Sequence, residues 1–218
     1  MSKTVIKLPE HQSIYREIRS MILFGVLVPG QAVTIQGLTE MISAGMTPVR
    51  EAIRRLTAEG ALESGGNRRV KVPVMTRERL EEIGYARLSI EPRLTEIAAQ
   101  RMSDECIADL IELDANVDAA IESGSIERYL EFNYRFHFRL YDQARSPVLG
   151  KIAESLWLQV GPSLRIVCGR FGTANLPDKH DEALNALREG NAEHASRAIG
   201  DDIRQGLGQV RLTLGSDS

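Results

Sequence analysis

The stretch EFNYRFHFRLYD, residues 131–142, places an amide and an imidazole one helical turn apart. Asn133 and His137 are four residues apart, so on a helix they would lie on the same face. An amide oxygen and an imidazole nitrogen can both bind a metal ion, and the pair could form half of a metal site. The aromatic neighbours favour an alternative, in which His137 is a packed core residue. The residues alone leave both interpretations open.

A second group of reactive side chains is basic and lies in the first third of the chain. Residues 1–77 carry 11 Lys and Arg against 6 Asp and Glu, and the remaining residues carry 16 against 24. These balances of +5 and −8 make up the formal net charge of −3. The asymmetry predicts that only the first part meets an anionic polymer such as nucleic acid. A chance asymmetry within one domain is the alternative.

The basic residues fall on a pattern of three short helices and a hairpin. Apolar spacing predicts helices over 11–25, within 34–45 and over 47–60, the last with Thr47 as N-cap and Pro48 in its first turn. ESGGNRRVKVPV, residues 63–74, predicts a hairpin around a glycine turn. Three helices followed by a basic hairpin predict a winged helix-turn-helix, whose third helix enters the DNA major groove.

The predicted DNA contacts lie on the third helix and on the hairpin. Arg50 could pair with a guanine edge, and the other basic side chains would contact phosphates. A solvated helix face is the alternative for this run of charges. The basic set is Arg50, Arg54 and Arg55 on the helix, and Arg68, Arg69 and Lys71 on the hairpin.

From Met75 onward, the pattern changes to long amphipathic helices with short breaks. We expect six of them, over 76–102, 104–122, 125–145, 147–171, 177–190 and 191–214. The predicted fold class is therefore mainly α. A winged helix-turn-helix over residues 1–75 is followed by an all-α six-helix antiparallel bundle over residues 76–218.

Composition excludes several other classes of protein. No apolar run approaches the roughly 20 residues of a membrane helix, and the first residues carry no secretory signal pattern. Cys106 and Cys168 are the only cysteines, and they form neither a CxxC motif nor a disulfide framework. A cytoplasmic protein without a membrane partner is the simplest interpretation.

The segment TPVREAIRRLTAEGAL, residues 47–62, resembles the GntR family of bacterial transcription regulators. Residues 87–101, 133–149 and 179–199 are similar to the FadR-type effector domain of that family, FCD. The effector domain is predicted to have six helices rather than seven, and in this it resembles the VanR branch of the family. The resemblance implies a homodimeric regulator, commonly a repressor, that reads an inverted-repeat double-stranded DNA operator and responds to a small carboxylate effector.

The resemblance also implies a metal site. The family has an Asp or Asn four residues before a His, a His that opens the next-to-last helix, and a His on the last helix. These positions fall on Asn133, His137, His180 and Asp202, so a carboxylate replaces the last imidazole. Aspartate can bind zinc, nickel or manganese, and it favours harder ions such as Mn²⁺. We expect one divalent transition metal per chain; direct hydrogen bonds from the two histidines to an acid are the alternative.

The resemblance points to residues that would bind the effector. Arg87 matches a family arginine that would grip the carboxylate, and an ion pair with Glu91, one turn later, is an equal alternative. Independently of the resemblance, Tyr134, Tyr141 and Trp157 are candidate pocket linings, and packing in the core is their alternative. Arg165 is a further candidate, for which an exposed or structural role is the alternative.

At the DNA-reading end, the sequence departs from the family. Gly45-Met46-Thr47-Pro48 replaces Ser-Arg-Thr-Pro, and Gln36 stands where the preceding helix has an arginine. Each lost phosphate contact lowers the salt dependence of DNA binding by about one unit of slope. We therefore expect the protein to bind DNA more weakly than members of the family do, or to recognise a different operator sequence. Thr47 and Gln36 are expected to contact DNA together with the arginines.

Two other functions would also use a metal site. A metal-dependent hydrolase could activate water there, but the sequence has no HExxH motif, and Glu131 falls on a different face from Asn133. A metal-responsive sensor would use the ion itself as its signal. The basic first part favours a regulator, and we predict that the protein is not an enzyme.

Overall fold

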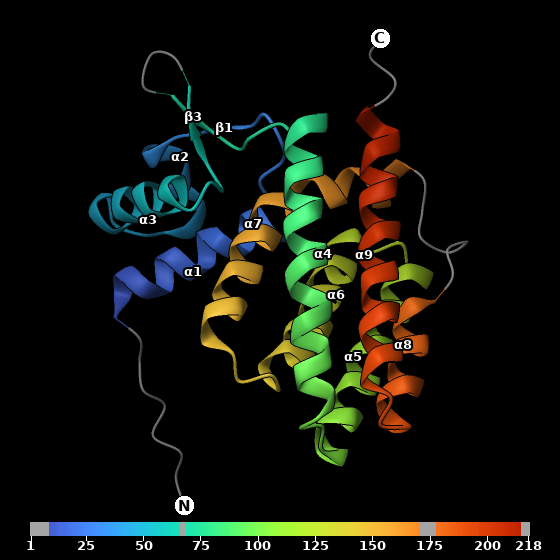
Figure 1. Ribbon diagram of the computed structural model, residues 1–218. Helices are drawn as coiled ribbons and strands as arrows, with labels where there is room; N and C mark the ends of the chain where they lie inside the picture. Colours follow the sequence, from blue (N-terminus) through green and yellow to red (C-terminus); the bar gives the residue numbers. More distant parts are fainter. Residues whose placement is uncertain (1–8, 66–68, 171–177, 215–218) are drawn as a thin grey trace, which may run out of the picture.

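The computed structural model describes residues 9–65, 69–170 and 178–214. Within these ranges, a small head lies beside a bundle of long helices (Figure 1). The predicted fold class, mainly α with an N-terminal winged helix-turn-helix, is confirmed. No helix in these ranges is long and apolar enough to cross a membrane.

The head consists of three helices and a small sheet. The helices are α1 (Glu10–Leu23), α2 (Ile35–Ile42) and α3 (Met46–Ala58); the strands are β1 (Ala32–Val33), β2 (Glu63–Ser64) and β3 (Val70–Lys71). The strand order is β1-β3-β2 and both pairs are antiparallel, so Lys71 faces Ala32 on one side and Glu63 on the other. The sequence predicts the β2–β3 hairpin but not β1, because a two-residue strand leaves no periodic pattern.

The start of α3 differs from the prediction. Gly45 is the N-cap, and Met46 and Thr47 both belong to the first helical turn. The prediction that Thr47 caps this helix is therefore wrong. Pro48 tolerates the shift because it remains within the first turn, where its missing N–H is not needed. Thr47 is left exposed and makes no capping hydrogen bond.

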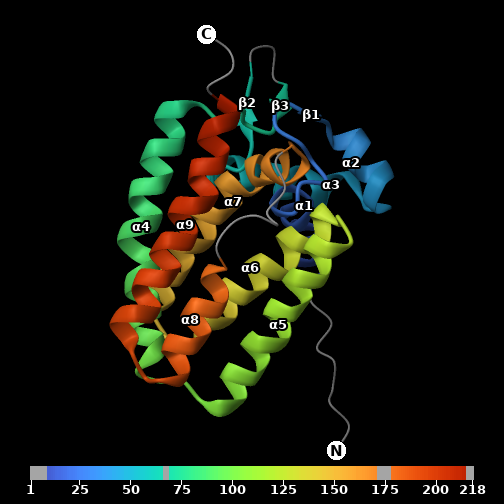
Figure 2. The same cartoon turned by 90° about the vertical axis from the view of Figure 1, so that its right-hand side faces the viewer.

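The described part of the bundle contains six helices, which follow the predicted ranges within a few residues. They are α4 (Arg77–Ala99), α5 (Asp104–Glu122), α6 (Ile126–Asp142), α7 (Pro147–Arg170), α8 (Lys179–Arg188) and α9 (Ala192–Leu214). Ser103 caps α5 and Asp178 caps α8, each by accepting a hydrogen bond from a backbone N–H three residues later. Figure 2 shows α4 and α9 side by side at one edge of the bundle, with α5 at the other.

Apolar burial connects the head with the bundle. One core lies within the bundle, among side chains of all six of its helices, with Ala153 as the contribution of α7. The core of the head contains Ile18 of α1 and Leu56 of α3, and it also contains Trp157 and Leu158 of α7. Accordingly, α1 packs against both α3 and α7. The domain boundary after residue 75 stays a prediction, because α7 contributes side chains to the core of the head.

A buried polar cluster lies where α4, α6 and α7 meet. Glu91 is fully buried and accepts two hydrogen bonds from Arg87, from Nε at 2.6 Å and from Nη2 at 3.1 Å. The Tyr141 hydroxyl donates to Glu91 at 2.7 Å, and Trp157 Nε1 donates at 2.9 Å. The Arg87 guanidinium also lies over the Trp157 ring at 4.3 Å. The ion pair that the sequence leaves open for Arg87 is thus present.

Replacing Glu91 by alanine should lower the free energy of unfolding by about 3–5 kcal/mol, because the Arg87 guanidinium would stay buried without its counter-charge. The control is Glu96→Ala on the same helix, where Glu96 pairs with Arg93 in contact with solvent and such pairs contribute about 0.2–1 kcal/mol. Urea unfolding followed by circular dichroism measures both changes. Equal stability of the two variants would contradict the role of the buried pair.

Candidate functional site

Three side chains from different helices of the bundle converge on one point. His137 comes from α6, His180 from the first turn of α8 and Asp202 from α9, and their ligand atoms all lie within 4.8 Å of one another. His137 Nε2 is 3.4 Å from His180 Nε2 and 3.1 Å from Asp202 Oδ2. Both imidazoles are buried, whereas the Asp202 side chain is 24% exposed and connects the cluster with solvent.

Hydrogen bonds at the outer nitrogens orient both imidazoles. His180 Nδ1 lies 2.9 Å from Asp114 Oδ1 of α5, and because an ionised carboxylate only accepts, Nδ1 carries the proton. His137 Nδ1 lies 3.0 Å from the Tyr141 hydroxyl, whose own proton goes to Glu91. Tyr141 therefore accepts from His137. In this arrangement both Nε2 atoms present lone pairs to the centre of the cluster.

The charges around this centre are strongly coupled. Burial lowers the pKa of His137 and so favours its neutral form. Burial also opposes charge on His180, but the hydrogen bond to Asp114 and the charge of Asp202 raise the pKa of His180 above its usual value. Burial alone would raise the pKa of Asp202, yet when the imidazoles carry a proton, the hydrogen bond from His137 and the positive charge of the imidazoles bring it down to about 2. The carboxylate of Asp202 therefore stays ionised, and either a proton or a metal ion on the imidazoles would balance it.

The donor set fits a divalent metal ion. Zinc–nitrogen bonds in proteins are about 2.0–2.1 Å long, so two ligand atoms on one ion lie about 3.0–3.4 Å apart. The 3.1 Å and 3.4 Å contacts of His137 Nε2 fall in this range. Two imidazoles and one carboxylate can bind a divalent transition metal and leave positions for an exogenous ligand. A proton shared between the same groups is the alternative that metal titration would test.

Asn133, the fourth predicted ligand, lies one helical turn before His137 on α6. It is 8% exposed and occupies the same face of the helix. Its position agrees with the spacing argument, and its role as a ligand remains a prediction.

The sequence does not reveal Asp114, although Asp114 orients one of the two imidazoles. Acidic residues recur along α5, at positions 104, 105, 109, 112, 114, 118 and 122. Only the packing of α5 against α8 brings one of them to His180. The contact spans 66 residues, so no local spacing could have identified it.

Two of the predicted effector residues, Arg87 and Tyr141, belong to the buried cluster. Arg87 uses Nε and Nη2 on Glu91, and its Nη1 makes no hydrogen bond to any residue that the structure describes. Tyr141 is 2% exposed and links Glu91 to His137 through its hydroxyl. Tyr141 therefore serves as a hydrogen-bond bridge, and Nη1 of Arg87 is the donor left for a ligand.

The other two predicted effector residues lie on the side of the head. The Tyr134 ring stacks on Phe138 at 4.2 Å, and its hydroxyl accepts from Arg19 of α1 at 3.4 Å. Arg165 packs against Gly25, just after α1, where an added Cβ would come within 2.6 Å of Arg165 Cδ. These contacts hold α6 and α7 against the head and give the effector prediction for both residues no support.

Most of the predicted DNA contacts are exposed on the head. They are Gln36 on α2, Thr47, Arg50 and Arg54 on α3, and Arg69 before β3. Arg54 pairs with Glu51 at 3.1 Å on the surface, where a phosphate could compete for it. Arg68 lies outside the described residues.

Arg55 is held on another side of α3. Its guanidinium lies over the Tyr15 ring of α1 at 3.7 Å, and its Nε donates to Glu59 at 2.9 Å. These contacts tie α3 to α1. The Arg55 side chain is still 59% exposed, and its contact with DNA stays a prediction.

Comparisons with known proteins match both parts of the chain. Residues 10–72 match bacterial regulatory proteins of the gntR family, and residues 82–205 match the FCD domain. The HTH-type transcriptional regulator McbR of Escherichia coli (strain K12) is 25% identical over 197 residues, 89% of either chain. The HTH-type transcriptional repressor GlaR of the same organism is 30% identical over 175 residues, 77% of this chain and 79% of its own. The solved structure of E. coli McbR/YncC shares the fold, with a TM-score of 0.88 and 24% identity over 95% of this chain and 99% of the other.

Changing Asp114 to asparagine should weaken metal binding about 10–100-fold, because His180 loses the carboxylate that sets its tautomer and raises its basicity. Asp109→Asn on the same helix is the control, since Asp109 pairs with Arg139 at the surface. Calorimetric titration of the chelator-stripped protein with Zn²⁺ or Mn²⁺ measures the affinities. The assignment fails if both variants bind metal as tightly as the parent protein.

Proposed function

Because the chain belongs to the GntR family of bacterial regulatory proteins and carries the FCD domain, we propose that it is a regulator that senses a small organic acid. Its relatives are transcriptional regulators, which confirms the prediction of a DNA-binding regulator rather than an enzyme. The convergence of His137, His180 and Asp202 within 4.8 Å is the observation that supports a sensing site in the bundle.

The three convergent residues would hold one divalent ion of zinc, nickel or manganese, with Asn133 adding a neutral oxygen. Such an ion supplies a positive charge to which a carboxylate can bind. Asp114 and Tyr141 hold the imidazoles in the orientation that presents both Nε2 atoms. The carboxylate replacing an imidazole in the donor set favours the harder ions of this group.

The acid would reach the cluster from the exposed side of Asp202, and its carboxylate would accept a hydrogen bond from Nη1 of Arg87. Glu91 already accepts from Nε and Nη2 of that guanidinium and keeps it in a fixed plane. A fixed donor loses little entropy when a ligand binds, which favours a small and rigid acid. The proposed effector class is therefore a compact organic acid.

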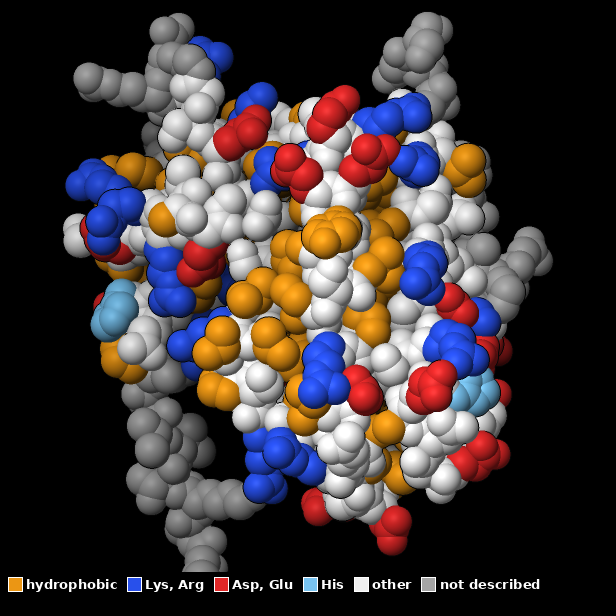
Figure 3. Space-filling view, in the orientation of Figure 1, with side chains coloured by type: hydrophobic (Ala, Val, Ile, Leu, Met, Phe, Trp, Pro, Cys, Tyr) orange, Lys and Arg blue, Asp and Glu red, His pale blue; other side chains and the backbone are white. Residues whose placement is uncertain are grey.

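We propose a homodimer that reads an inverted-repeat operator, since two heads related by a two-fold axis would place α3 in two half-sites. Hydrophobic side chains gather over α4 and the first turns of α7 on the face shown in Figure 3. Exposed hydrophobic residues of these two helices are Tyr85 of α4 and Val148 and Ile152 of α7, which are 78%, 69% and 41% exposed. Contiguous apolar surface of this kind marks a protein interface, and we assign it to the second copy.

The acid would act by changing the distance or angle between the two heads. Coupling of this kind is typically worth about 1–3 kcal/mol, and it requires that the acid prefer one arrangement of the heads. We propose repression relieved by the acid, in line with the relative named as a repressor. Placement in the cytoplasm and in the VanR branch belongs to the same proposal.

Arg50→Ala should weaken binding to a random-sequence DNA duplex and lower the slope of log affinity against log salt by about one unit, because one phosphate neutralisation is lost. The control is Arg128→Ala on α6, which removes an exposed arginine outside the head. Fluorescence anisotropy across a salt series gives both slopes. An unchanged slope for Arg50→Ala would show that Arg50 does not contact DNA phosphates.

Native mass spectrometry with elemental analysis of the untreated protein should show a dimer with about one divalent transition metal per chain. His137→Ala should abolish metal uptake and leave DNA binding by the head intact, because the two sites lie in different parts of the fold. Metal-free protein that still binds an acid tightly would refute the metal's role. DNA affinity that follows metal concentration without any acid would favour the metal-sensor alternative.

A further inference from the structure

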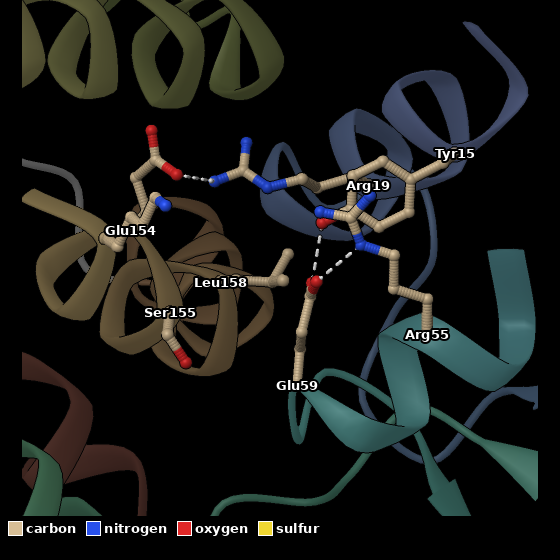
Figure 4. A pocket seen from close by; sticks show the side chains of 8 residues that line it. Tyr15, Arg19, Arg55, Glu59, Glu154, Ser155 and Leu158 are labelled. Carbon is tan, nitrogen blue, oxygen red and sulfur yellow. Dashed lines mark hydrogen bonds and ion pairs between the residues drawn. The ribbon is translucent and has the colours of Figure 1, made fainter. Parts of the chain in front are cut away.

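We infer that a cavity between the head and the bundle is a second ligand site, which takes a compact oxyanion such as a phosphate or a carboxylate. The cavity has a volume of about 290 Å³ and lies between α1, α3 and α7 (Figure 4). None of the three convergent residues of the metal cluster lines it. The inference therefore goes beyond the proposed function, in which the acid binds inside the bundle.

Helical spacing brings charged groups to this cavity from all three walls. Arg55 of α3 and Glu59, the residue that caps its C-terminus, are four residues apart, and Lys151 and Ser155 on α7 have the same spacing, so each pair lies on one side of its helix. Arg19 of α1 forms the third wall. The charged groups thus face one another across the contact between head and bundle.

The α3 wall is a closed network that needs no ligand. Glu59 accepts from Arg55 Nε at 2.9 Å and from the Tyr15 hydroxyl at 2.6 Å. Burial and the hydrogen bond to Glu59 raise the pKa of Tyr15 to about 12, so this hydroxyl stays protonated. The charges of Arg55 and Glu59 cancel, and the remaining charge of the cavity comes from α1 and α7.

Among the described residues, Arg19 finds only distant acceptors for its guanidinium. Its Nη2 lies 3.4 Å from the Tyr134 hydroxyl and 3.9 Å from Glu154 Oε2, whereas good N–H···O bonds measure about 2.7–3.2 Å. The Arg19 side chain is only 17% exposed, so water cannot fully replace the missing partner. Figure 4 shows its guanidinium between Glu154 and the Arg55–Glu59 pair.

Two further donors of the cavity are available on α7. Lys151 forms no ion pair with any residue that the structure describes. The Ser155 Oγ lies 3.5 Å from Gln159 Nε2, also longer than a good hydrogen bond, so its hydroxyl can donate to an anion. Arg19 and Lys151 together face one carboxylate, Glu154, so this side of the cavity carries a formal charge of +1. An oxyanion matches that charge and these donors, whereas a cation does not.

An oxyanion held by Arg19, Lys151 and Ser155 would bridge α1 of the head and α7 of the bundle. It would restrict the movement of the head relative to the bundle, because its donors belong to both. α3 carries Arg50 and packs on α1, so occupancy of the cavity would couple to DNA binding through the position of the head.

The test is calorimetric titration of the full-length, chelator-treated protein with inorganic phosphate and, separately, with acetate, at constant ionic strength balanced by chloride. Saturable binding of at least one anion is expected, and Lys151→Ala should weaken it about tenfold or more. The matched control is Arg128→Ala, which also removes one exposed positive charge but lies outside the cavity. The anion that binds more tightly shows whether the natural ligand carries a phosphate or a carboxylate group.

Two more variants distinguish an anion bound in the cavity from one bound elsewhere on the protein. Arg19→Lys keeps the charge but loses the planar fork, so it should also weaken binding, with an unchanged melting temperature as proof of folding. His137→Ala should bind the anion as tightly as the parent protein. The inference is overturned if neither anion binds, if Lys151→Ala equals Arg128→Ala, or if His137→Ala abolishes binding and so moves the anion to the metal cluster.

Discussion

A single buried carboxylate constrains the centre of this protein. Glu91 accepts hydrogen bonds from Arg87, Tyr141 and Trp157, so one side chain of α4 holds α6 and α7 in a fixed arrangement. A buried charge is tolerated only when its lone pairs are satisfied, and this requirement makes each of the three donors necessary. Tyr141, once its proton is committed to Glu91, accepts from His137 and sets the direction of that imidazole. The geometry of the His137, His180 and Asp202 cluster therefore depends on an interaction that includes none of these three residues.

The same network reaches the head through Trp157. Its indole N–H donates to Glu91, its ring lies 4.9 Å from the His137 ring, and it belongs to the apolar core that includes α1 and α3. Tyr134 meets the same indole edge-on at 5.7 Å and accepts from Arg19. Aromatic side chains in such contacts have few alternative rotamers. The side chains between the bundle and the head are therefore closely packed and hold a fixed arrangement. The charged cavity lies on the same boundary, where a change in one part must be accommodated by the other.

Several features of the site follow from local spacing and could be predicted. Asn133 and His137 share a face because they are four residues apart, and the family pattern extends the set to His180 and Asp202. The functional partners of these residues could not be predicted in the same way. Asp114 contacts His180 across 66 residues, and α5 offers other carboxylates with the same local surroundings. The helix-helix packing selects one of them.

The sequence by itself determined the mainly helical class, the approximate helix ranges and the basic character of the head, because these depend on periodicity and composition within short windows. Only the tertiary structure decided that Arg87 pairs with Glu91, that Arg55 turns to Tyr15, and that both Nε2 atoms face one centre. Those outcomes depend on how helices far apart in the chain pack together. The orientation of each side chain is then set by the residue that it contacts. That residue lies far away in the sequence, so local spacing does not identify it.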